Sequence, residues 1–278
     1  MAESYFDTDE FYNASREANY VKVADIARNI AWTTDTQWGE LQITINLSKP
    51  EKDPRAIAAA AKKKADDPYI DPATGYKISV YYEGSRNADP ESPEDMRRCM
   101  ELVHFLHDSG ITVDHSFDLR ERIGFYENLC IGSGGIPFED YAEVRGWMNE
   151  ILDWLDSLHR PKVLAHIDSV ATNFLFYPEG SGEALRLIDW EYAGMADPLL
   201  DIAMCAIYSY YTREQAEQLT AFYFGRKPTE EEQRIVFRYM ALGGFLWALW
   251  AVYKSNCGKS FGDYTLVMYR YAKDFRKI

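Results

Sequence analysis

Two neighbouring stretches decide the fold, Val163-Leu-Ala-His-Ile-Asp-Ser-Val-Ala-Thr-Asn-Phe-Leu-Phe176 and Leu187-Ile-Asp-Trp-Glu191. Each contains a short apolar run typical of a strand, followed by acidic or polar residues. Because neighbouring short strands end close together, we expect Asp168, Asn173 and Asp189 to converge on one point. Two carboxylates and a carboxamide offer the oxygen ligands that Mg²⁺ prefers.

Groups of this kind suit phosphoryl transfer. The reaction needs a carboxylate that orients or deprotonates the acceptor hydroxyl, and metal ligands that neutralise developing negative charge. The spacing His-x-Asp-x-x-x-x-Asn, with a further aspartate sixteen residues after Asn173, supplies both. Any one of these residues alone would be read as a solvated surface or turn residue. Only their joint spacing indicates a site.

The same stretches resemble the catalytic loop and metal-binding aspartate of the choline kinase and aminoglycoside phosphotransferase family, which is related to the protein kinases. The longer run Ile188-Asp-Trp-Glu-Tyr-Ala-Gly-Met-Ala-Asp-Pro-Leu-Leu-Asp-Ile-Ala203 is similar to bacterial choline kinases of the LicA type. Similar residues cover 69–82, 86–101, 113–126 and 261–275, so the resemblance spans about residues 66–278. It implies an α+β, protein-kinase-like fold, with a mostly helical C-terminal lobe and a reduced or atypical N-terminal lobe.

The resemblance also implies the catalytic residues. Asp168 would be the catalytic carboxylate, and His166 would organise the catalytic loop without reacting. Asn173 and Asp189 would hold Mg²⁺. Glu191 would lie beside the metal site.

Two further roles concern the nucleotide and the support of the loop. The segment from Tyr81 through Glu83 to Gly84 would form the hinge whose backbone meets the adenine of ATP. Asp201 would support the catalytic loop through its backbone. A helix N-cap just before Ile202 is the alternative reading of Asp201.

A pair of tryptophans points to the acceptor. Trp247 and Trp250 are three residues apart and share one face of a helix. In the resembling family, two such tryptophans and tyrosines matching Tyr192 and Tyr264 line the choline pocket, and a quaternary ammonium is held by aromatic faces. A buried helix rich in tryptophan can also be simply core. We expect choline or a related amino-alcohol, and rank an aminoglycoside, which needs many carboxylates, below it.

Charge and composition limit the partners. The formal net charge of −14 argues against a general nucleic-acid binder, because phosphate neutralisation needs clustered basic residues. It suits a cationic substrate. The cysteines show neither CxxC spacing nor nearby metal-spaced histidines, which predicts reduced thiols in place of a zinc site or disulfides; they are Cys99, Cys130, Cys205 and Cys257. The sequence indicates no oligomeric state.

Targeting signals are not apparent. The acidic segment from Met1 to Glu10 lacks the basic flank and apolar run of a signal peptide. The longest apolar run, Tyr239 to Tyr253, is too short to span a bilayer and predicts a buried helix. We therefore expect a cytoplasmic protein without membrane insertion.

Local patterns predict the other elements. Helices are expected at residues 11–30, 56–61, 92–110 and 141–158, and strands at 41–47, 76–82, 163–165, 174–177 and 185–188. Ser92, Thr212 and Thr229 each begin a sequence with capping-box spacing. Gly132-Ser-Gly-Gly135 lacks the ending of a phosphate-binding loop and is interpreted as a flexible connector.

The N-terminal part departs from the family. Residues 1–70 contain one glycine, Gly39, and lack the glycine-rich loop and strand lysine that kinases place on the phosphates. Residues 1–62 instead resemble an internal segment of Firmicute-type galactose-1-phosphate uridylyltransferases, most clearly from Ile43 to Ala58. The His-Pro-His nucleophile motif of that family is absent. We interpret the chain as a fusion of an atypical segment, residues 1–65, with a choline-kinase-like domain, residues 66–278.

Three functions remain open on the sequence. The first is a choline-type kinase that uses ATP and Mg²⁺. The second is a weak or inactive remnant that binds an amino-alcohol without efficient turnover, because the phosphate-gripping residues are missing. The third, uridylyl transfer, is disfavoured because the nucleophile is absent.

Overall fold

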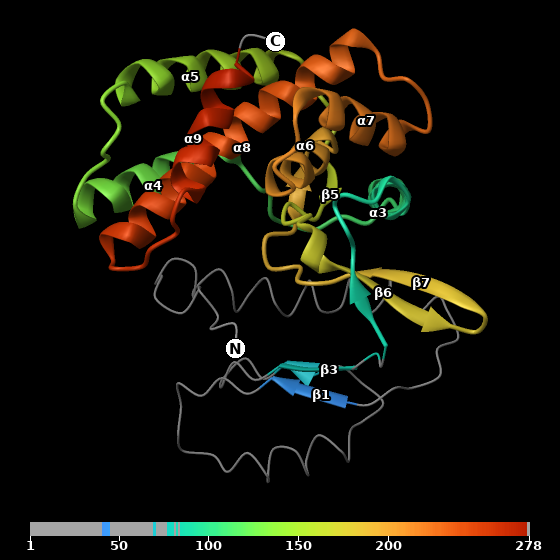
Figure 1. Ribbon diagram of the computed structural model, residues 1–278. Helices are drawn as coiled ribbons and strands as arrows, with labels where there is room; N and C mark the ends of the chain where they lie inside the picture. Colours follow the sequence, from blue (N-terminus) through green and yellow to red (C-terminus); the bar gives the residue numbers. More distant parts are fainter. Residues whose placement is uncertain (1–40, 45–68, 71–76, 81, 83, 277–278) are drawn as a thin grey trace. The chain divides into compact units, whose positions relative to one another are not determined.

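The computed structural model describes residues 41–44, 69–70, 77–80, 82 and 84–276 (Figure 1). The chain divides into two compact units. The first unit comprises residues 1–87 and 175–191, and the second comprises 88–174 and 192–278. The helices predicted at 11–30 and 56–61, the boundary predicted near residue 65, and the hinge residues Tyr81 and Glu83 lie outside the described residues.

The first unit contains two small sheets among its described residues. In one, β3 (Lys77–Val80) pairs antiparallel with both β1 (Leu41–Thr44) and β2 (Tyr69–Ile70), giving the order β1-β3-β2. Leu41 lies opposite Val80 in this register. In the other, the order is β4-β6-β7. The strands predicted at 41–47 and 76–82 are thus confirmed over the parts that are described.

The second sheet is built around a hairpin. Strands β6 (Phe174–Glu179) and β7 (Gly182–Leu187) are joined by a turn in which Gly180 has a φ of 60°, a conformation that favours glycine. The short strand β4 (Arg86–Asn87) pairs with β6. Arg86 forms a two-bond ion pair with Glu183, both bonds 3.0 Å long, and its guanidinium lies 4.3 Å from the ring centre of Phe176. The predicted strand–turn–strand is confirmed.

The second unit is mostly helical (Figure 1). A short antiparallel pair, β5 (Val163–Ala165) with β8 (Gly194–Ala196), lies among the helices. A 3₁₀ turn, η1, covers Ala171–Asn173. The helices are α3 (Pro93–His107), α4 (Leu119–Ser133), α5 (Tyr141–Ser157), α6 (Leu199–Tyr208), α7 (Arg213–Phe224), α8 (Glu230–Asn256) and α9 (Tyr264–Asp274).

Side-chain caps begin several of these helices. Thr212 and Thr229 form complete capping boxes with the third helical residue, as predicted. Ser92 accepts a hydrogen bond from the backbone N–H of Asp95, and Pro93 occupies the first helical position. The reciprocal half of that box differs from the prediction, because the Asp95 carboxylate accepts the N–H of Asp89. The helix start is nevertheless where the sequence places it.

Glycines predicted to form a flexible connector in fact end a helix. Gly132 and Ser133 belong to the last turn of α4, and Gly134 is the C-cap with a φ of 151°. The N–H of Gly135 donates to the carbonyl of Cys130, which satisfies one of the last helical acceptors. The prediction of a flexible connector was therefore wrong, and the glycines serve to stop the helix.

Helix α8 forms the core of the second unit. It packs against α4, α6 and α9, and its residues from Tyr239 to Val252 are buried except for the partly exposed Trp250. By length and composition it is the one candidate membrane span among the described residues, yet 89% of its most apolar window is buried inside the protein. The predicted buried helix is confirmed.

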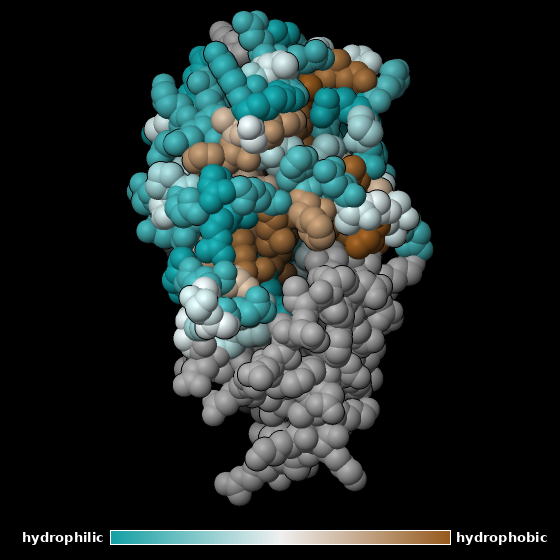
Figure 2. Space-filling model, turned by 90° about the vertical axis from the view of Figure 1, so that its right-hand side faces the viewer, coloured by the Kyte–Doolittle hydropathy of each residue, from teal (hydrophilic) through white to brown (hydrophobic). Residues whose placement is uncertain are grey.

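The surface of the second unit is largely hydrophilic. Figure 2 shows a face on which polar side chains dominate and apolar ones form separate areas. Cys99, Cys130 and Cys205 are buried free thiols and Cys257 is an exposed one. Burial raises the pKa of the Cys130 thiol to about 12, which keeps it protonated and unreactive near neutral pH.

Two glycines let other helices approach α8. A Cβ atom added to Gly244 would lie 2.6 Å from the carbonyl oxygen of Met268 and 2.6 Å from the Cβ of Tyr271, both in α9. Gly243 faces flexible side chains of α6 instead, with Ile207 Cδ1 at 2.9 Å. Backbone atoms and a Cβ cannot move away by a change of rotamer. The close contact between α8 and α9 therefore requires glycine at position 244.

We expect Gly244→Ala to destabilise the protein by about 1–3 kcal/mol, the usual cost of overpacking a core. Urea unfolding followed by circular dichroism measures the change. Gly132→Ala in α4 is the matched control, because no atom lies within 4 Å of its added Cβ. That variant should be neutral or stabilised by up to about 1 kcal/mol. Equal losses in both variants would contradict the packing argument.

Candidate active site

The predicted catalytic loop joins β5 to β6 and closes on itself. The side-chain nitrogen of Asn173 donates to the backbone carbonyl of Asp168 at 2.8 Å and to its carboxylate oxygen Oδ2 at 2.9 Å. The N–H of Asn173 donates to the carbonyl of Val170, which forms the η1 turn. Asn173 is buried, while Asp168 is partly exposed. The structure therefore brings these two predicted residues together.

This arrangement leaves a suitable ligand for a divalent cation. Both partners of the Asn173 nitrogen are acceptors, which identifies that atom as the donor and leaves Oδ1 as the ligating oxygen. An amide oxygen is the kind of ligand that Mg²⁺ takes, and this ion keeps its other positions for water and phosphates, so Asn173 fits the predicted role. Among the described residues there is no group of three or more His, Cys, Asp or Glu side chains placed to hold a metal. Binding of Mg²⁺ stays a prediction.

The second predicted metal ligand belongs to the other unit. Asp189 lies two residues after β7 and has a φ of 66°. Trp190 follows it, and its indole nitrogen donates to the carbonyl of Leu187 at 3.0 Å. These features define the local shape of the first unit. Convergence of Asp189 with Asp168 and Asn173 stays a prediction.

The residue directly before Asp168, the predicted catalytic carboxylate, has a strained backbone. Ile167, fully buried, has a φ of 70°. A β-branched residue seldom adopts this left-handed conformation, which costs about 1–3 kcal/mol and persists only where surrounding contacts enforce it. The backbone conformation of Ile167 sets the direction in which the side chain of Asp168 projects from the loop. The contacts that maintain this conformation therefore determine the placement of Asp168.

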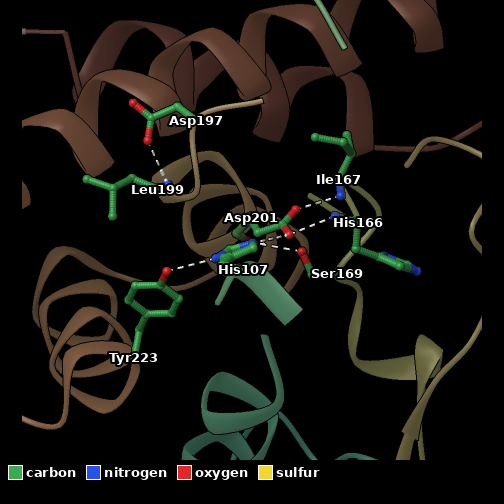
Figure 3. A network of polar contacts seen from close by, with 8 residues as sticks. All are labelled: His107, His166, Ile167, Ser169, Asp197, Leu199, Asp201 and Tyr223. Atoms are coloured by element: carbon green, nitrogen blue, oxygen red, sulfur yellow. Dashed lines mark hydrogen bonds and ion pairs between the residues drawn. The ribbon is translucent and has the colours of Figure 1, made fainter. Parts of the chain in front are cut away.

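Asp201 provides those contacts (Figure 3). Its carboxylate accepts the backbone N–H of His166 at 2.8 Å and that of Ile167 at 2.5 Å. The hydroxyl of Ser169 donates to the backbone carbonyl of Asp201 at 3.0 Å. Three hydrogen bonds thus fasten the loop to the first turn of α6. The predicted support of the loop by Asp201 is confirmed.

The alternative reading of Asp201 as a helix N-cap was wrong. Asp201 lies inside α6, whose N-cap position is occupied by Pro198. A side chain in the first helical turn can point away from the helix and accept from another segment. Here the Asp201 carboxylate accepts backbone N–H groups of the predicted catalytic loop. Local sequence spacing therefore indicated the wrong hydrogen-bond partner.

Asp201 is charged although it is completely buried. Burial by itself raises the pKa of this carboxyl, but hydrogen bonds and charge from His107, together with the His166 N–H, hold the pKa below its usual value. His107 lies in α3, and its Nε2 is 3.0 Å from Oδ2 of Asp201. The sequence analysis missed His107, because no local motif marks a histidine that lies 94 residues from its partner.

His166 lies within the predicted catalytic loop. It is fully buried, and its backbone N–H is held by Asp201. Figure 3 shows its ring directed away from the Asp201 carboxylate. Its role in organising the loop, and its exclusion from the reaction, stay predictions.

The four predicted substrate residues form one continuous aromatic cluster. The rings of Tyr192 and Trp247 lie 5.6 Å apart at 87°, and those of Trp247 and Trp250 lie 6.2 Å apart at 84°. Trp250 and Tyr264 follow at 6.4 Å and 77°. Near-perpendicular neighbours present ring faces in different directions, as the walls of a box do. This geometry can surround a cation with aromatic faces.

The cluster also includes two residues that the sequence analysis missed. Tyr208 of α6 lies 5.8 Å from the Trp247 ring, and Phe261, before α9, lies 4.9 Å from the Trp250 ring. Phe261 lies three residues before Tyr264, a spacing that could have indicated it. Tyr208 carries no such signal, because it comes from a separate helix.

The Tyr264 hydroxyl of this cluster is protonated at neutral pH. Burial raises the pKa of Tyr264, and the negative charges of Tyr210, when ionised, and Asp168 raise it further. Placement of an acceptor hydroxyl near Asp168 by these rings stays a prediction.

The hinge prediction is tested only at its described residues. The ring of Tyr82 lies 4.3 Å from that of Tyr177 in β6. Gly84 has a φ of 73°, and a Cβ atom there would lie 3.3 Å from the side chain of Pro178. The chain next to the predicted hinge is therefore packed on β6. Contact of Tyr81 and Glu83 with a nucleotide stays a prediction.

Comparison with known proteins places this geometry in a family. Residues 88–235, just over half of the chain, match the profile of the phosphotransferase enzyme family. The chain belongs to this family. Choline kinase LicA from Streptococcus pneumoniae superposes with a TM-score of 0.67 at 24% identity, covering 92% of this chain and 98% of that one. A choline/ethanolamine kinase family protein from Mesorhizobium loti superposes with a TM-score of 0.69 at 25% identity, and the match covers 95% of each chain.

The predicted α+β, protein-kinase-like fold of this phosphotransferase is thereby confirmed. Its N-terminal resemblance is confirmed as well. Residues 2–78 match the N-terminal domain of galactose-1-phosphate uridyl transferase. The uridylyltransferase of Pediococcus pentosaceus is 54% identical over 158 residues, 56% of this chain and 25% of that protein. The chain thus spans about a quarter of that relative's length.

Acid should lower the stability of the folded phosphotransferase by protonating Asp201. Because its folded pKa is depressed, its contribution to stability is present above about pH 4 and is lost as pH falls through the folded pKa. We expect Asp201→Asn to cost about 3 kcal/mol at pH 7, since an amide cannot replace an acceptor of three hydrogen bonds. The variant should then lose less stability than the parent between pH 5 and pH 3.

Urea unfolding at pH 7, 5, 4 and 3 measures both effects. Asp108→Asn is the control, because this carboxylate is exposed and its weak contact with His104 should contribute less than about 1 kcal/mol. An acid profile for Asp201→Asn that matches the parent would contradict the assignment.

Proposed function

We propose that the chain transfers the γ-phosphoryl group of ATP to the hydroxyl of choline or a similar amino-alcohol. The observation that carries this proposal is the aromatic cluster of Tyr192, Trp247, Trp250 and Tyr264. A quaternary ammonium cannot donate hydrogen bonds and is recognised by aromatic faces. The solved choline and choline/ethanolamine kinases with this fold support the same acceptor class.

The proposed step conserves atoms and charge. The acceptor oxygen forms a bond to the γ-phosphorus as the bond to the bridging oxygen breaks, and ADP leaves. Asp168 orients the hydroxyl and accepts its proton. Mg²⁺, when bound, would neutralise charge on the phosphates, with Asn173 Oδ1 and the predicted Asp189 as its protein ligands. A solved LicA structure contains AMP, which supports nucleotide use in this proposal.

The acidic charge of the chain fits a cationic acceptor. At a net charge of −14, long-range attraction favours a quaternary ammonium over an anionic substrate. The predicted absence of nucleic-acid binding agrees with the same charge. A cytoplasmic location and the lack of membrane insertion remain part of the proposal, in keeping with the buried setting of α8.

A second function is favoured by one observation. Residues 1–70 contain a single glycine, so the sequence lacks the glycine-rich loop that kinases place over ATP phosphates. A remnant of this kind would bind an amino-alcohol and turn over poorly or not at all. Calorimetry with choline and a coupled assay of ADP release separate the two: binding with turnover supports the kinase, and binding alone supports the remnant. An aminoglycoside in the same assay tests the alternative acceptor that the sequence analysis ranked lower.

Asp168→Asn should reduce ADP release with choline at least about 100-fold, because the amide cannot accept the proton of the hydroxyl. Choline binding measured by calorimetry should change much less, since the aromatic cluster is intact. Asp153→Asn, which removes an exposed carboxylate paired with Arg120, is the control and should retain full turnover. Unchanged turnover in Asp168→Asn would refute the catalytic assignment.

Trp250→Leu tests the acceptor. Loss of one aromatic wall should raise the KM for choline by about 3- to 30-fold, the range expected for one cation–π contact, with little change in the KM for ATP. The neutral carbon isostere of choline, in which carbon replaces the quaternary nitrogen, should bind worse than choline to the parent and about equally to the variant. Trp154→Leu in α5 is the control. A preference for choline that survives Trp250→Leu would contradict the proposal.

A further inference from the structure

A tyrosine in α7 is connected to the catalytic loop through two buried side chains. The hydroxyl of Tyr223 lies 2.8 Å from Nδ1 of His107, and Nε2 of His107 lies 3.0 Å from the Asp201 carboxylate. All three side chains are buried, with Asp201 inaccessible to solvent. Figure 3 shows them in one row that ends at the backbone of His166 and Ile167. The row joins α7, α3 and α6 to the loop.

The direction of the hydrogen bond between His107 and Asp201 follows from its acceptor. The ionised Asp201 carboxylate can only accept, so Nε2 of His107 carries a hydrogen. The Tyr223 hydroxyl bonds to Nδ1 in either form of the ring: it donates to the bare nitrogen of a neutral ring and accepts from the N–H of a charged one. Burial raises the pKa of Tyr223, which keeps that hydroxyl protonated. Tyr223 thus holds the His107 ring in the orientation from which Nε2 donates to Asp201.

His107 supplies the hydrogen bond that orients the Asp201 carboxylate from the side opposite to the loop. The two loop amides, of His166 and Ile167, occupy separate oxygens of that carboxylate. Rotation of the carboxylate would therefore weaken at least one of the bonds that maintain the left-handed conformation of Ile167. The ring of Tyr223 also lies 4.8 Å from that of His104, so the phenol is fixed by packing as well as by its hydroxyl.

We propose that Tyr223 and His107 are positioning residues for phosphoryl transfer: they orient Asp201, which holds the backbone of Ile167 and thereby places Asp168. This inference rests on the proposed function, because it assigns a catalytic consequence to the row. Neither residue touches the acceptor or the nucleotide in this account. Their contribution is to the rate of the step, through the geometry of Asp168, and not to the affinity for substrate.

Tyr223→Phe removes only the hydroxyl and retains the ring contacts. We expect kcat to fall about three- to tenfold, the effect of one buried hydrogen bond, with less than a twofold change in the KM for choline or ATP. Amide hydrogen exchange of His166 and Ile167 should become faster by a similar factor. The control is Tyr271→Phe, which removes another buried hydroxyl, one that donates to the carbonyl of Tyr211 at 2.8 Å.

A comparison of two variants at His107 tests whether a remaining N–H donor to Asp201 preserves function. Gln offers a side-chain N–H that can still donate to Asp201, whereas Leu offers none. His107→Gln should therefore retain more of kcat, and slower exchange at Ile167, than His107→Leu. If the histidine variants fail to fold, Tyr223→Phe still decides the matter.

Two results would overturn the inference. One is a kcat for Tyr223→Phe equal to that of the parent, and the other is an equal loss in Tyr271→Phe, which would indicate general destabilisation. Absence of turnover in the parent protein would refute the proposed function instead. In that case, exchange at His166 and Ile167 decides whether the row positions the loop: unchanged exchange in Tyr223→Phe refutes it.

Discussion

The buried charge of Asp201 is the constraint on which the active-site geometry depends. A carboxylate removed from water is stable only when hydrogen-bond donors surround it. Here the donors are His107 in α3 and the backbone of His166 and Ile167 in the catalytic loop. The same charge that needs these donors therefore holds the loop in a strained shape. Helices without a catalytic residue thus determine where Asp168 lies.

The aromatic cluster depends on the packing of the helical core. Gly244 allows the backbone of α9 to approach α8 within the space that a Cβ would fill. Tyr264, the first residue of α9, then lies beside Trp250 of α8. The same aromatic rings can therefore contribute to the core and present a face to an acceptor molecule. The two readings of the tryptophans, core and recognition, are therefore compatible: Trp247 is buried, whereas Trp250 keeps part of its surface exposed.

The first unit contains residues from two unrelated sequence families. Residues 2–78 match a uridyl transferase domain and residues 88–235 a phosphotransferase profile. Strands β1 and β2 lie within the former match, and β3 begins in it and ends two residues beyond it. Strands β6 and β7 of the other sheet lie within the latter match. Pairing between strands uses backbone groups that every sequence offers, so each stretch can form a sheet of its own.

Much of this molecule could be predicted from residues close together in the chain. Thr212 and Thr229 mark helix starts because their caps act over three residues, and the Asp168–Asn173 pairing lies within one short loop. The tryptophan pair follows from helical spacing. Such signals need no knowledge of the fold, because the interacting groups are neighbours by covalent connection.

The remaining features are set by tertiary packing alone. His107 lies 94 residues from Asp201 and 116 from Tyr223, and Tyr208 reaches the aromatic cluster from a different helix. A single histidine or tyrosine on a helix has many possible neighbours, and the sequence contains no period or motif that selects one. The choice is made when the helices pack, because only then does burial require each polar group to have a partner. Asp201, which the sequence indicated as a helix cap or a support of the loop, is for this reason the centre of a hydrogen-bond network.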